Sequence, residues 1–465
     1  MCIVIKACRQ NKESVLAKVR AGKLDSAALS ISSLVDEIIL SMHTSGILKF
    51  LSTNIQDKRA DNTVIPYDLV WASAIAAKMK VKTSLTDIPY AISDHRTLAK
   101  LGYTLIETEG KLGAGLMREG SLRALLGKYQ AEDLFNGYNS VVQNQVLPHL
   151  NLVPNIHILD CTDLEVNFKN KHYEQSGISV SKRTNSPCRG YKLATIRGIV
   201  GDTGIIEDIR FGPINVHDMS LSERMIKHSP VFRSGDILIN DRGFISRPVM
   251  NYLKRKRNVD TYVPLRNNMD AYRLAVECAI QNNAWSKHPN PKRSQQRISL
   301  VPHVGPYWES ACPSTDVDLN ACVVWDMENG QYFVFVTTDT SKLARDIIKI
   351  YELRPEIEED YRQLKDFWKI EDFKSTKINM IAFHIVCVLF GYLFFQLYTM
   401  LPDGEKLAGK SLPVLLKVYD AKPQSFVVLY TDYEFGVITL LDMMELYSAC
   451  GQVVREKIKA VMEKI

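Results

Sequence analysis

The segment Asp236–Asn240, with the sequence DILIN, constrains the fold of this chain more than any other stretch. Its centre is wholly apolar, which is typical of a central strand that is buried on both faces of a sheet. Patterns of further strands and of one helix surround it at 156–166, 192–200, 205–211, 245–257 and 260–265. Strands and a helix in this order predict a mixed α/β sheet.

Within this region, Gly201-Asp-Thr-Gly204 predicts the turn of a hairpin between two strands. The segment 267–330 then interrupts the pattern with short strands, a polar stretch and turn residues. A β-rich insertion inside the larger domain, which we place at 151–400, explains this interruption most simply.

Helical patterns flank the sheet region on both sides. We expect residues 1–150 to form a helical DNA-binding region, since 26–41 and 69–79 have apolar residues at helical spacing. Residues 84–102 resemble a helix-turn-helix in which Asp94 or Ser93 caps the second helix. We expect residues 401–465 to be helical too, with helices at 412–420 and 442–463 and with dimerisation as a candidate role.

One apolar run, Ile378–Met400, is long enough to span a bilayer. No basic cluster flanks it closely on one side, and the chain is 46% apolar, which is enough to build sizeable cores. We therefore interpret this run as a buried core helix.

The net charge of +6 and the pI near 8.6 permit a polyanionic partner without requiring one. The nine cysteines are odd in number and form no C-x-x-C pair, which argues against a disulfide scaffold or a structural zinc site. Basic residues gather in the segment 242–257, just after the DILIN strand, and this segment contains no acid. From this segment we expect phosphate contacts by Arg242, Lys254, Arg255, Lys256 and Arg257.

The stretch 351–368, YELRPEIEEDYRQLKDFW, predicts a helix with a narrow apolar stripe. Pro355 suits the first helical turn, where its missing N–H has no cost. It leaves Tyr351 just before the helix. The stripe consists of Ile357, Tyr361, Leu364 and Trp368.

Arg354, Glu358 and Lys365 form a second line beside this stripe. A carboxylate between two cations at the edge of a buried face suits a site that holds metal and phosphate together. The alternative is a solvated helix with ordinary pairs of opposite charge.

Three acids from distant segments complete the candidate site. Asp160 follows an apolar run and Asp241 follows the DILIN strand, so we expect both at strand ends, and Glu358 lies on the helix. Such carboxylates can converge on two divalent ions about 4 Å apart, which is the arrangement that drives in-line phosphoryl transfer. Two rivals stay open, because Asp163 could replace Asp160 and Glu359 could replace Glu358.

These residues carry a resemblance to a known family. Asp241-Arg-Gly-Phe244 resembles the second-aspartate motif of bacterial insertion-sequence transposases of the D-D-E type, and Asp160 in LDCTD resembles the first aspartate. The resemblance covers roughly 60–400, and Pro355 departs from it, since the family usually has a bulky residue there. The Y-x2-R-x3-E-x6-K signature of insertion-sequence family four is matched at every spacing by Tyr351, Arg354, Glu358 and Lys365.

The resemblance implies an RNase H-like mixed-sheet catalytic core over 151–400, with the β-rich insertion at about 267–330, and cut-and-paste DNA transposition. It implies that Asp160, Asp241 and Glu358 bind two Mg²⁺ ions, for which Mn²⁺ can substitute. It also implies that transposon-end phosphates are held by Tyr351, Arg354 and Lys365.

The implied partners are double-stranded DNA, as terminal inverted repeats and as target, and a second copy of the chain in a synaptic homodimer. The apolar start at Met1–Cys8 is too short for a signal peptide. We therefore expect a cytoplasmic, nucleoid-associated bacterial protein without a membrane partner.

Two other functions are compatible with these residues. One is another RNase H-like DNA nuclease, such as a resolvase, and the other is a non-catalytic DNA-binding regulator of transposition. Three intact carboxylates argue against the regulator, since a pure DNA binder gains nothing from acids that face phosphate. Trp285, Trp308 and Trp325 are candidates for stacking on an exposed base, with a core role in the insertion as the alternative for each.

Overall fold

The computed structural model describes residues 4–60, 63, 65–92, 94–106, 117–181, 183–308, 316–402, 404–420 and 424–462. The chain divides into two compact units. Unit 1 consists of residues 1–137 and 367–465, and unit 2 consists of residues 138–366. Ser93, one of the two predicted helix caps, lies outside the described residues.

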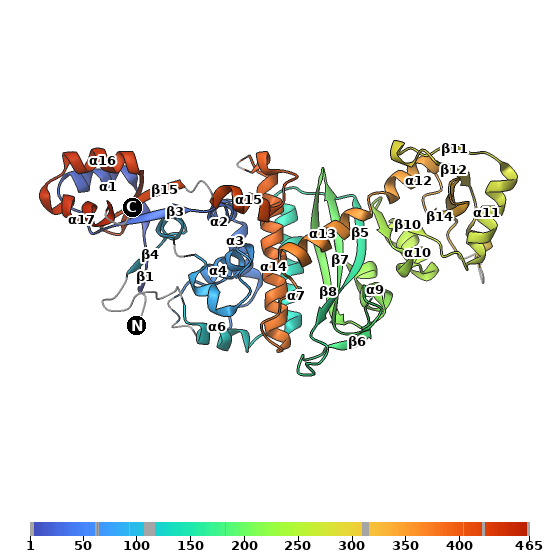
Figure 1. Ribbon diagram of the computed structural model, residues 1–465, viewed down its shortest axis with the longest axis horizontal. Helices are drawn as coiled ribbons and strands as arrows, with labels where there is room; N and C mark the ends of the chain where they lie inside the picture. Colours follow the sequence, from blue (N-terminus) through green and yellow to red (C-terminus); the bar gives the residue numbers. More distant parts are fainter. Residues whose placement is uncertain are drawn as a thin grey trace. The chain divides into compact units, whose positions relative to one another are not determined.

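Unit 2 is built on a mixed sheet of ten strands among the described residues (Figure 1). The DILIN strand, β9, lies inside this sheet and runs parallel to both of its neighbours, β5 and β10. Leu238 and Ile239 are fully buried, so the predicted central strand is confirmed. The strand order is β11-β12-β13-β14-β10-β9-β5-β7-β6, and β8 pairs with β7 along residues 191–200, beyond the part of β7 that pairs with β6. The strands are β5 (Ile156–Val166), β6 (Gly177–Val180), β7 (Pro187–Val200), β8 (Thr203–Pro213), β9 (Ile237–Asn240), β10 (Asp260–Pro264), β11 (Ser286–Lys287), β12 (Gln296–Val301), β13 (Asn320–Asp326) and β14 (Gln331–Thr337).

The predicted hairpin joins β7 to β8, and Gly201 takes the left-handed conformation that its turn requires. The ladder between the two strands shifts register after Ile196, where Glu207 is the extra residue of a β-bulge.

Helices cover the sheet of unit 2. One hydrophobic cluster packs α9 and α10 against β5, β7 and β9 through Met225, Ile226 and Val249. The helices and helical turns of this unit are Val142–Val146, α8 (Leu147–His149), α9 (Asp218–His228), Arg242–Phe244, α10 (Arg247–Tyr252), Leu253–Arg257, α11 (Asp270–Asn282), Pro291–Arg293, Gly305–Tyr307, α12 (Ala344–Tyr351), α13 (Pro355–Arg362) and Gln363–Phe367.

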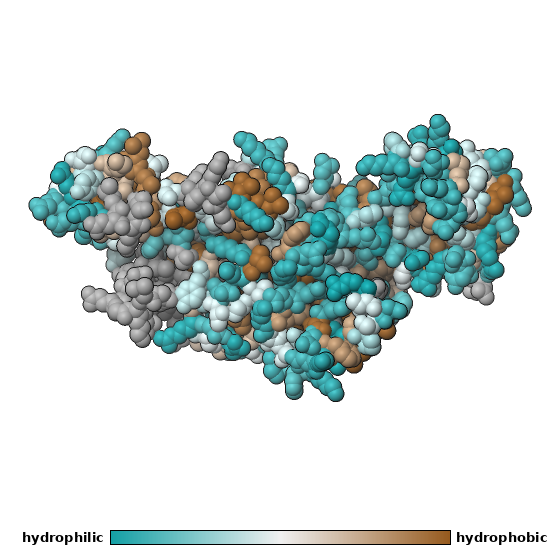
Figure 2. Space-filling model, viewed as in Figure 1, coloured by the Kyte–Doolittle hydropathy of each residue, from teal (hydrophilic) through white to brown (hydrophobic). Residues whose placement is uncertain are grey.

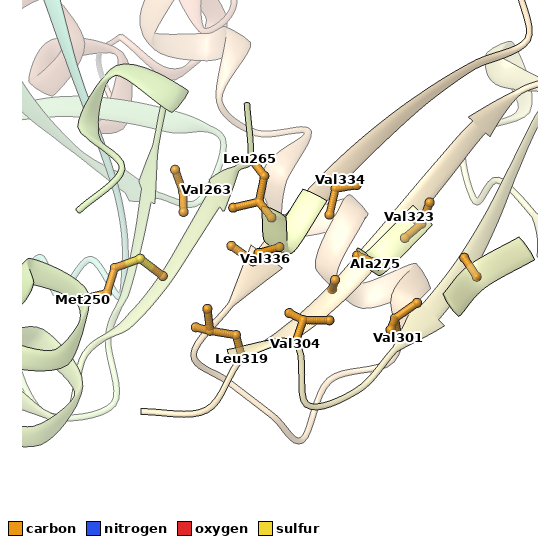
Figure 3. Packing of buried hydrophobic residues seen from close by; sticks show 13 residues of the cluster. Met250, Val263, Leu265, Ala275, Val301, Val304, Leu319, Val323, Val334 and Val336 are labelled. Carbon is orange, nitrogen blue, oxygen red and sulfur yellow. The ribbon is translucent and has the colours of Figure 1, made fainter. Parts of the chain in front are cut away.

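The β-rich segment 267–330 extends this sheet, because β13 pairs with β14 and β14 pairs with β10. Hydrophilic residues cover most of this end of unit 2 in the view of Figure 2. Beneath them, Ala275 of α11 packs with the valines of β12, β13 and β14 (Figure 3).

Unit 1 contains most of the remaining helices and two smaller sheets. Helix α14 packs against α2 and α4 and is buried along nearly its whole length, although it is long and apolar enough to cross a membrane. The helices of this unit are α1 (Lys12–Arg20), α2 (Leu34–Thr44), α3 (Ile47–Asn54), α4 (Tyr67–Met79), Leu85–Tyr90, α5 (His95–Lys100), α6 (Glu119–Leu126), α14 (Ile378–Met400), Glu405–Leu407, α15 (Leu412–Asp420), α16 (Leu440–Ala449) and α17 (Gln452–Met462), and α7 (Ala131–Val141) crosses the boundary between the units.

The terminal regions are mostly helical, as expected, but they also contain strands that the sequence did not predict. A four-stranded sheet with the order β2-β16-β15-β3 joins β2 (Arg9–Gln10) and β3 (Ser26–Ser32) to β15 (Gln424–Thr431) and β16 (Glu434–Thr439). A second sheet pairs β1 (Val4–Ala7) with β4 (Tyr103–Ile106). The helix predicted at 26–41 begins only at Leu34, after a capping box at Ser33, because β3 pairs with a strand some 400 residues away in the chain.

Two smaller expectations also change. The first element of the predicted helix-turn-helix is a 3₁₀ helix, while Asp94 caps α5 as predicted, accepting from the backbone N–H of Thr97 at 2.9 Å. The helix predicted at 442–463 is broken at Cys450–Gly451 into α16 and α17.

Shortening Ile239 to alanine should lower the free energy of unfolding by about 3 kcal/mol, because a buried side chain at the centre of the sheet leaves a cavity. Urea unfolding followed by circular dichroism measures the loss. Phe333→Ala, at a side chain that is 42% exposed on β14, is the control and should cost much less. Equal losses would contradict the central position of β9.

Candidate active site

The parallel pairing of β5 and β9 brings two of the predicted acids together. Their ladder pairs Leu159 with Asn240, and the next residues along the two strands are Asp160 and Asp241. The expectation that Asp160 ends its strand is wrong, since β5 continues to Val166 through its pairing with β7. Asp160 nevertheless lies level with the point where β9 ends.

The guanidinium of Arg354 joins all three predicted acids. Its Nη2 lies 2.9 Å from Oδ2 of Asp160 and 3.8 Å from Oδ2 of Asp241, and its Nη1 lies 2.5 Å from Oε1 of Glu358. Three carboxylates from two strands and one helix therefore surround a single cation.

Burial is the largest influence on the pKa of Asp160, the most buried of the three acids. It raises the pKa of Asp160 to about 6, although the charge of Arg354 acts in the opposite direction. Burial would lower the pKa of Arg354, but Asp160 and Asp241 reverse that effect and raise it. With three acids and one guanidinium, the cluster keeps an excess of negative charge that attracts further cations.

The helix that carries Glu358 begins at Pro355, as predicted. A turn over 352–354 separates it from α12, whose last residue is Tyr351, so Arg354 stands at the N-cap of α13. The ring of Tyr351 packs on Phe335 of β14 with 4.6 Å between the ring centroids. Burial raises the pKa of the Tyr351 hydroxyl.

The apolar stripe of α13 faces the core, and Ile357 is fully buried. Within this stripe the hydroxyl of Tyr361 donates to the backbone carbonyl of Asp160 at 2.7 Å and lies 2.7 Å from Oγ1 of Thr195. The ammonium of Lys365 donates to the carbonyl of Asp163 at 2.5 Å. The two side chains thus tie the end of α13 and the helical turn after it to β5.

The two rival acids make other contacts. Asp163 lies 3.9 Å from the ammonium of Lys192. Glu359 is exposed on the outer side of α13 and pairs with Arg362 at 2.6 Å.

The basic segment that follows Asp241 is divided between structural and exposed roles. Lys254 pairs with Asp260 at 2.7 Å, and Arg257 donates to the backbone carbonyl at 227, in the last turn of α9, and to those at 229 and 232, just beyond it. The side chains of Arg242, Arg255 and Lys256 are exposed.

Sequence reasoning missed two polar contacts behind α13, of which the one to Asp360 is buried. Arg197 of β7 binds Asp360 through Nε at 2.7 Å and Glu356 through Nη1 at 2.8 Å. Two acids one turn apart on the helix, and an arginine inside an apolar strand, were the signals that could have revealed this contact.

A second buried group was also missed. His157 of β5 lies between Glu207, at 2.7 Å, and Asp236, at 3.2 Å. Burial alone would lower the pKa of His157, but the hydrogen bonds to these two acids raise it to about 9. The imidazole therefore links β5, β8 and the residue before β9.

The donor set of this site fits divalent cations, since carboxylate oxygens are the ligands that Mg²⁺ prefers. Among the described residues, no group of three acid, histidine or cysteine side chains is placed to hold one ion as the structure stands. The guanidinium of Arg354 lies against the same carboxylate oxygens, so the arginine and a metal ion compete for them.

A comparison with protein-family models finds one described as a transposase DDE domain, which matches residues 152–394. A comparison with curated proteins finds no match.

The affinity of the site for Mn²⁺ should fall as the pH drops through about 6. Asp160 binds a cation only when it is ionised, and its raised pKa means that protons compete from that pH downward, by about tenfold for each further pH unit. Isothermal titration at pH 5, 6 and 7.5 measures this change. Asp160→Asn should bind Mn²⁺ weakly and lack the step, and a flat profile in the unaltered protein would contradict the assignment.

Proposed function

This chain belongs to the transposase DDE domain family, whose model matches more than half of its residues, and we propose that it is the transposase of a bacterial insertion sequence. The reaction is metal-dependent cleavage at the transposon ends, followed by attack of the freed 3′-hydroxyl on target DNA in cut-and-paste transposition. The observation that carries the proposal is the meeting of Asp160, Asp241 and Glu358 around one guanidinium.

The sheet of unit 2 supports an RNase H-like core. Its strand order β8-β7-β5-β9-β10 starts with an antiparallel meander and ends with two strands parallel to β5. Asp160 lies on β5 and Asp241 directly follows the neighbouring parallel strand β9, so the two carboxylates can act together in phosphoryl transfer.

Membership of insertion-sequence family four rests on the spacing of Tyr351, Arg354, Glu358 and Lys365. The positions of three of these residues support this assignment. Arg354 contacts Glu358 directly, and Tyr351 ends the helix just before this pair.

Asp160, Asp241 and Glu358 would hold Mg²⁺, with Mn²⁺ as a substitute. When bound, the ions supply an activated water or 3′-hydroxyl and stabilise the leaving oxygen of the phosphodiester. Arg354 offsets part of the negative charge of the three acids, and its planar fork is equally suited to a DNA phosphate. Exposed Arg242, Arg255 and Lys256 add sequence-independent attraction for the DNA backbone.

Base stacking in the inserted strands is a further part of this proposal. The rings of Trp285, Trp325 and Tyr332 form one partly buried group, with centroid separations of 5.5, 6.1 and 6.2 Å. Trp308 packs against the core cluster of the same segment. A shared aromatic surface beside Arg297, which pairs with Trp325 across β12 and β13, suits an unstacked base.

The remaining assignments concern partners. We propose double-stranded transposon ends and target DNA as substrates, bacterial cytoplasm with nucleoid association as location, and no membrane partner. A homodimer through residues 401–465 is supported by apolar side chains that α15 and α16 expose, namely Val414, Val418, Leu441 and Met444. DNA contact by residues 84–102 stays a proposal, and Arg96 in this segment is already paired with Glu37.

Asp241→Asn or Glu358→Gln should slow cleavage of a labelled transposon end by about 1000-fold or more, because each removes a metal ligand. Binding of the same end, measured by gel shift, should persist. The substrate is a duplex with the inverted repeat that brackets the reading frame, and the assay is run with and without Mg²⁺. Undiminished cleavage in Mg²⁺ by either variant would refute the assignment, and cleavage without strand transfer would favour a nuclease.

Arg354→Ala and Lys365→Ala should weaken end binding and each reduce the slope of log affinity against log salt by about 1. Arg362→Ala, on the exposed side of α13, is the matched control and should leave the slope unchanged. Slopes equal to that of the control would identify Arg354 and Lys365 as structural cations.

A further inference from the structure

On the side away from the carboxylate cluster, helix α13 carries two acids that pair with Arg197: Asp360, which is buried, and Glu356, whose side chain is partly exposed. Glu356 and Asp360 lie one turn apart, and at 100° per residue both are about 160° around the helix from Glu358. Arg197 reaches both acids, at 2.8 and 2.7 Å. Arg197 and Asp360 are only 5% and 6% exposed.

The backbone around Arg197 is shaped to admit it. Arg197 follows the register shift between β7 and β8, and its guanidinium lies over Gly204 of β8. A Cβ atom at position 204 would overlap the Cζ, Nε and Nη2 atoms of the arginine. Thr195, on the same face of β7, meets Tyr361 of α13.

A buried ion pair of this kind adds little to the free energy of unfolding. Burying two charges removes their hydration, and replacing a buried ion pair by apolar residues of similar size is often neutral or stabilising. A directional contact does restrict the rotation and sliding of a helix more than an apolar contact does. A rotation of about 10° would move a side-chain tip about 6 Å from the helix axis by about 1 Å.

We propose that Arg197 and Asp360 are positioning residues, which set the rotation of α13 so that Glu358 faces Asp160 and Asp241. The second anchor is Tyr361, whose hydroxyl bonds to the backbone of Asp160 itself. This inference rests on the proposed function, because the geometry matters where carboxylates must share metal ions. The inference adds to the proposed function that cleavage depends on residues that contact neither the metal ions nor the DNA.

The test compares three variants of the full chain. Arg197→Met/Asp360→Leu removes the pair without leaving a lone buried charge. Gly204→Ala displaces the guanidinium and changes no charge. Arg362→Gln/Glu359→Gln is the control, because it removes an exposed ion pair from the same helix.

Four quantities are measured for each protein: the cleavage rate with Mg²⁺, end binding by gel shift, Mn²⁺ affinity by electron paramagnetic resonance, and the melting temperature. The first two variants should lose about 100-fold in cleavage rate, as expected for a misplacement of about 1 Å. They should also bind Mn²⁺ more weakly, while end binding matches the control. The melting temperature should match the control in the double variant and fall in Gly204→Ala, because displacing the guanidinium takes the arginine partner away from the buried Asp360. A purely structural role would lower the melting temperature and leave Mn²⁺ affinity unchanged in the folded protein.

The outcomes separate the two proposals. If the unaltered chain cleaves and both pair variants cleave and bind Mn²⁺ as it does, the positioning role is refuted and the proposed function stands. If the unaltered chain neither cleaves nor binds Mn²⁺, the proposed function fails and this inference fails with it. If the double variant does not fold, Gly204→Ala decides, and normal Mn²⁺ affinity in that variant overturns the inference.

Discussion

Three carboxylates that approach one another closely repel each other. For two unit charges 4 Å apart, this repulsion is about 4 kcal/mol at an effective dielectric constant of 20. Arg354 is the group that offsets this repulsion in unit 2. Its nitrogens point in fixed directions, so Nη1 serves Glu358 while Nη2 serves Asp160 and Asp241. The other features of the site are those that bring the three carboxylates to the guanidinium of Arg354.

Two independent parts of the fold accomplish this. The parallel register of β5 and β9 fixes the two aspartates through the backbone, without help from side chains. The helix α13 has no backbone pairing with the sheet and depends on side chains, with Tyr361 at Asp160 and Arg197 at Asp360. Pro355 sets where that helix begins, so that Arg354 at the N-cap and Glu358 in the first turn share one side.

The sequence predicted elements whose signals are local. DILIN, the turn at Gly201 and the start of α13 at Pro355 each follow from a few adjacent residues, and each is present. The strand β3 was read as helix because its pairing partner, β15, lies far along the chain, and distant pairing overrides local spacing.

The site shows the same division between local and distant information. The types and spacing of its acids pointed to a common site, but charge alone did not show which basic residues serve the fold. Arg257 belongs to a basic run, yet it donates to three backbone carbonyls that only the folded chain brings near it. Arg197 stood in an apolar strand, which was a signal of a buried partner, but only the folded chain shows that this partner is on α13.

On the proposed function, the charges of the site also explain how one arginine, Arg354, serves two purposes. Without metal, three acids exceed one guanidinium and hold it. Two divalent ions would make the cluster positive, so Arg354 would be repelled from the acids and a DNA phosphate would become its best partner. Metal and DNA would then favour each other's binding, since each relieves a cost that the other creates.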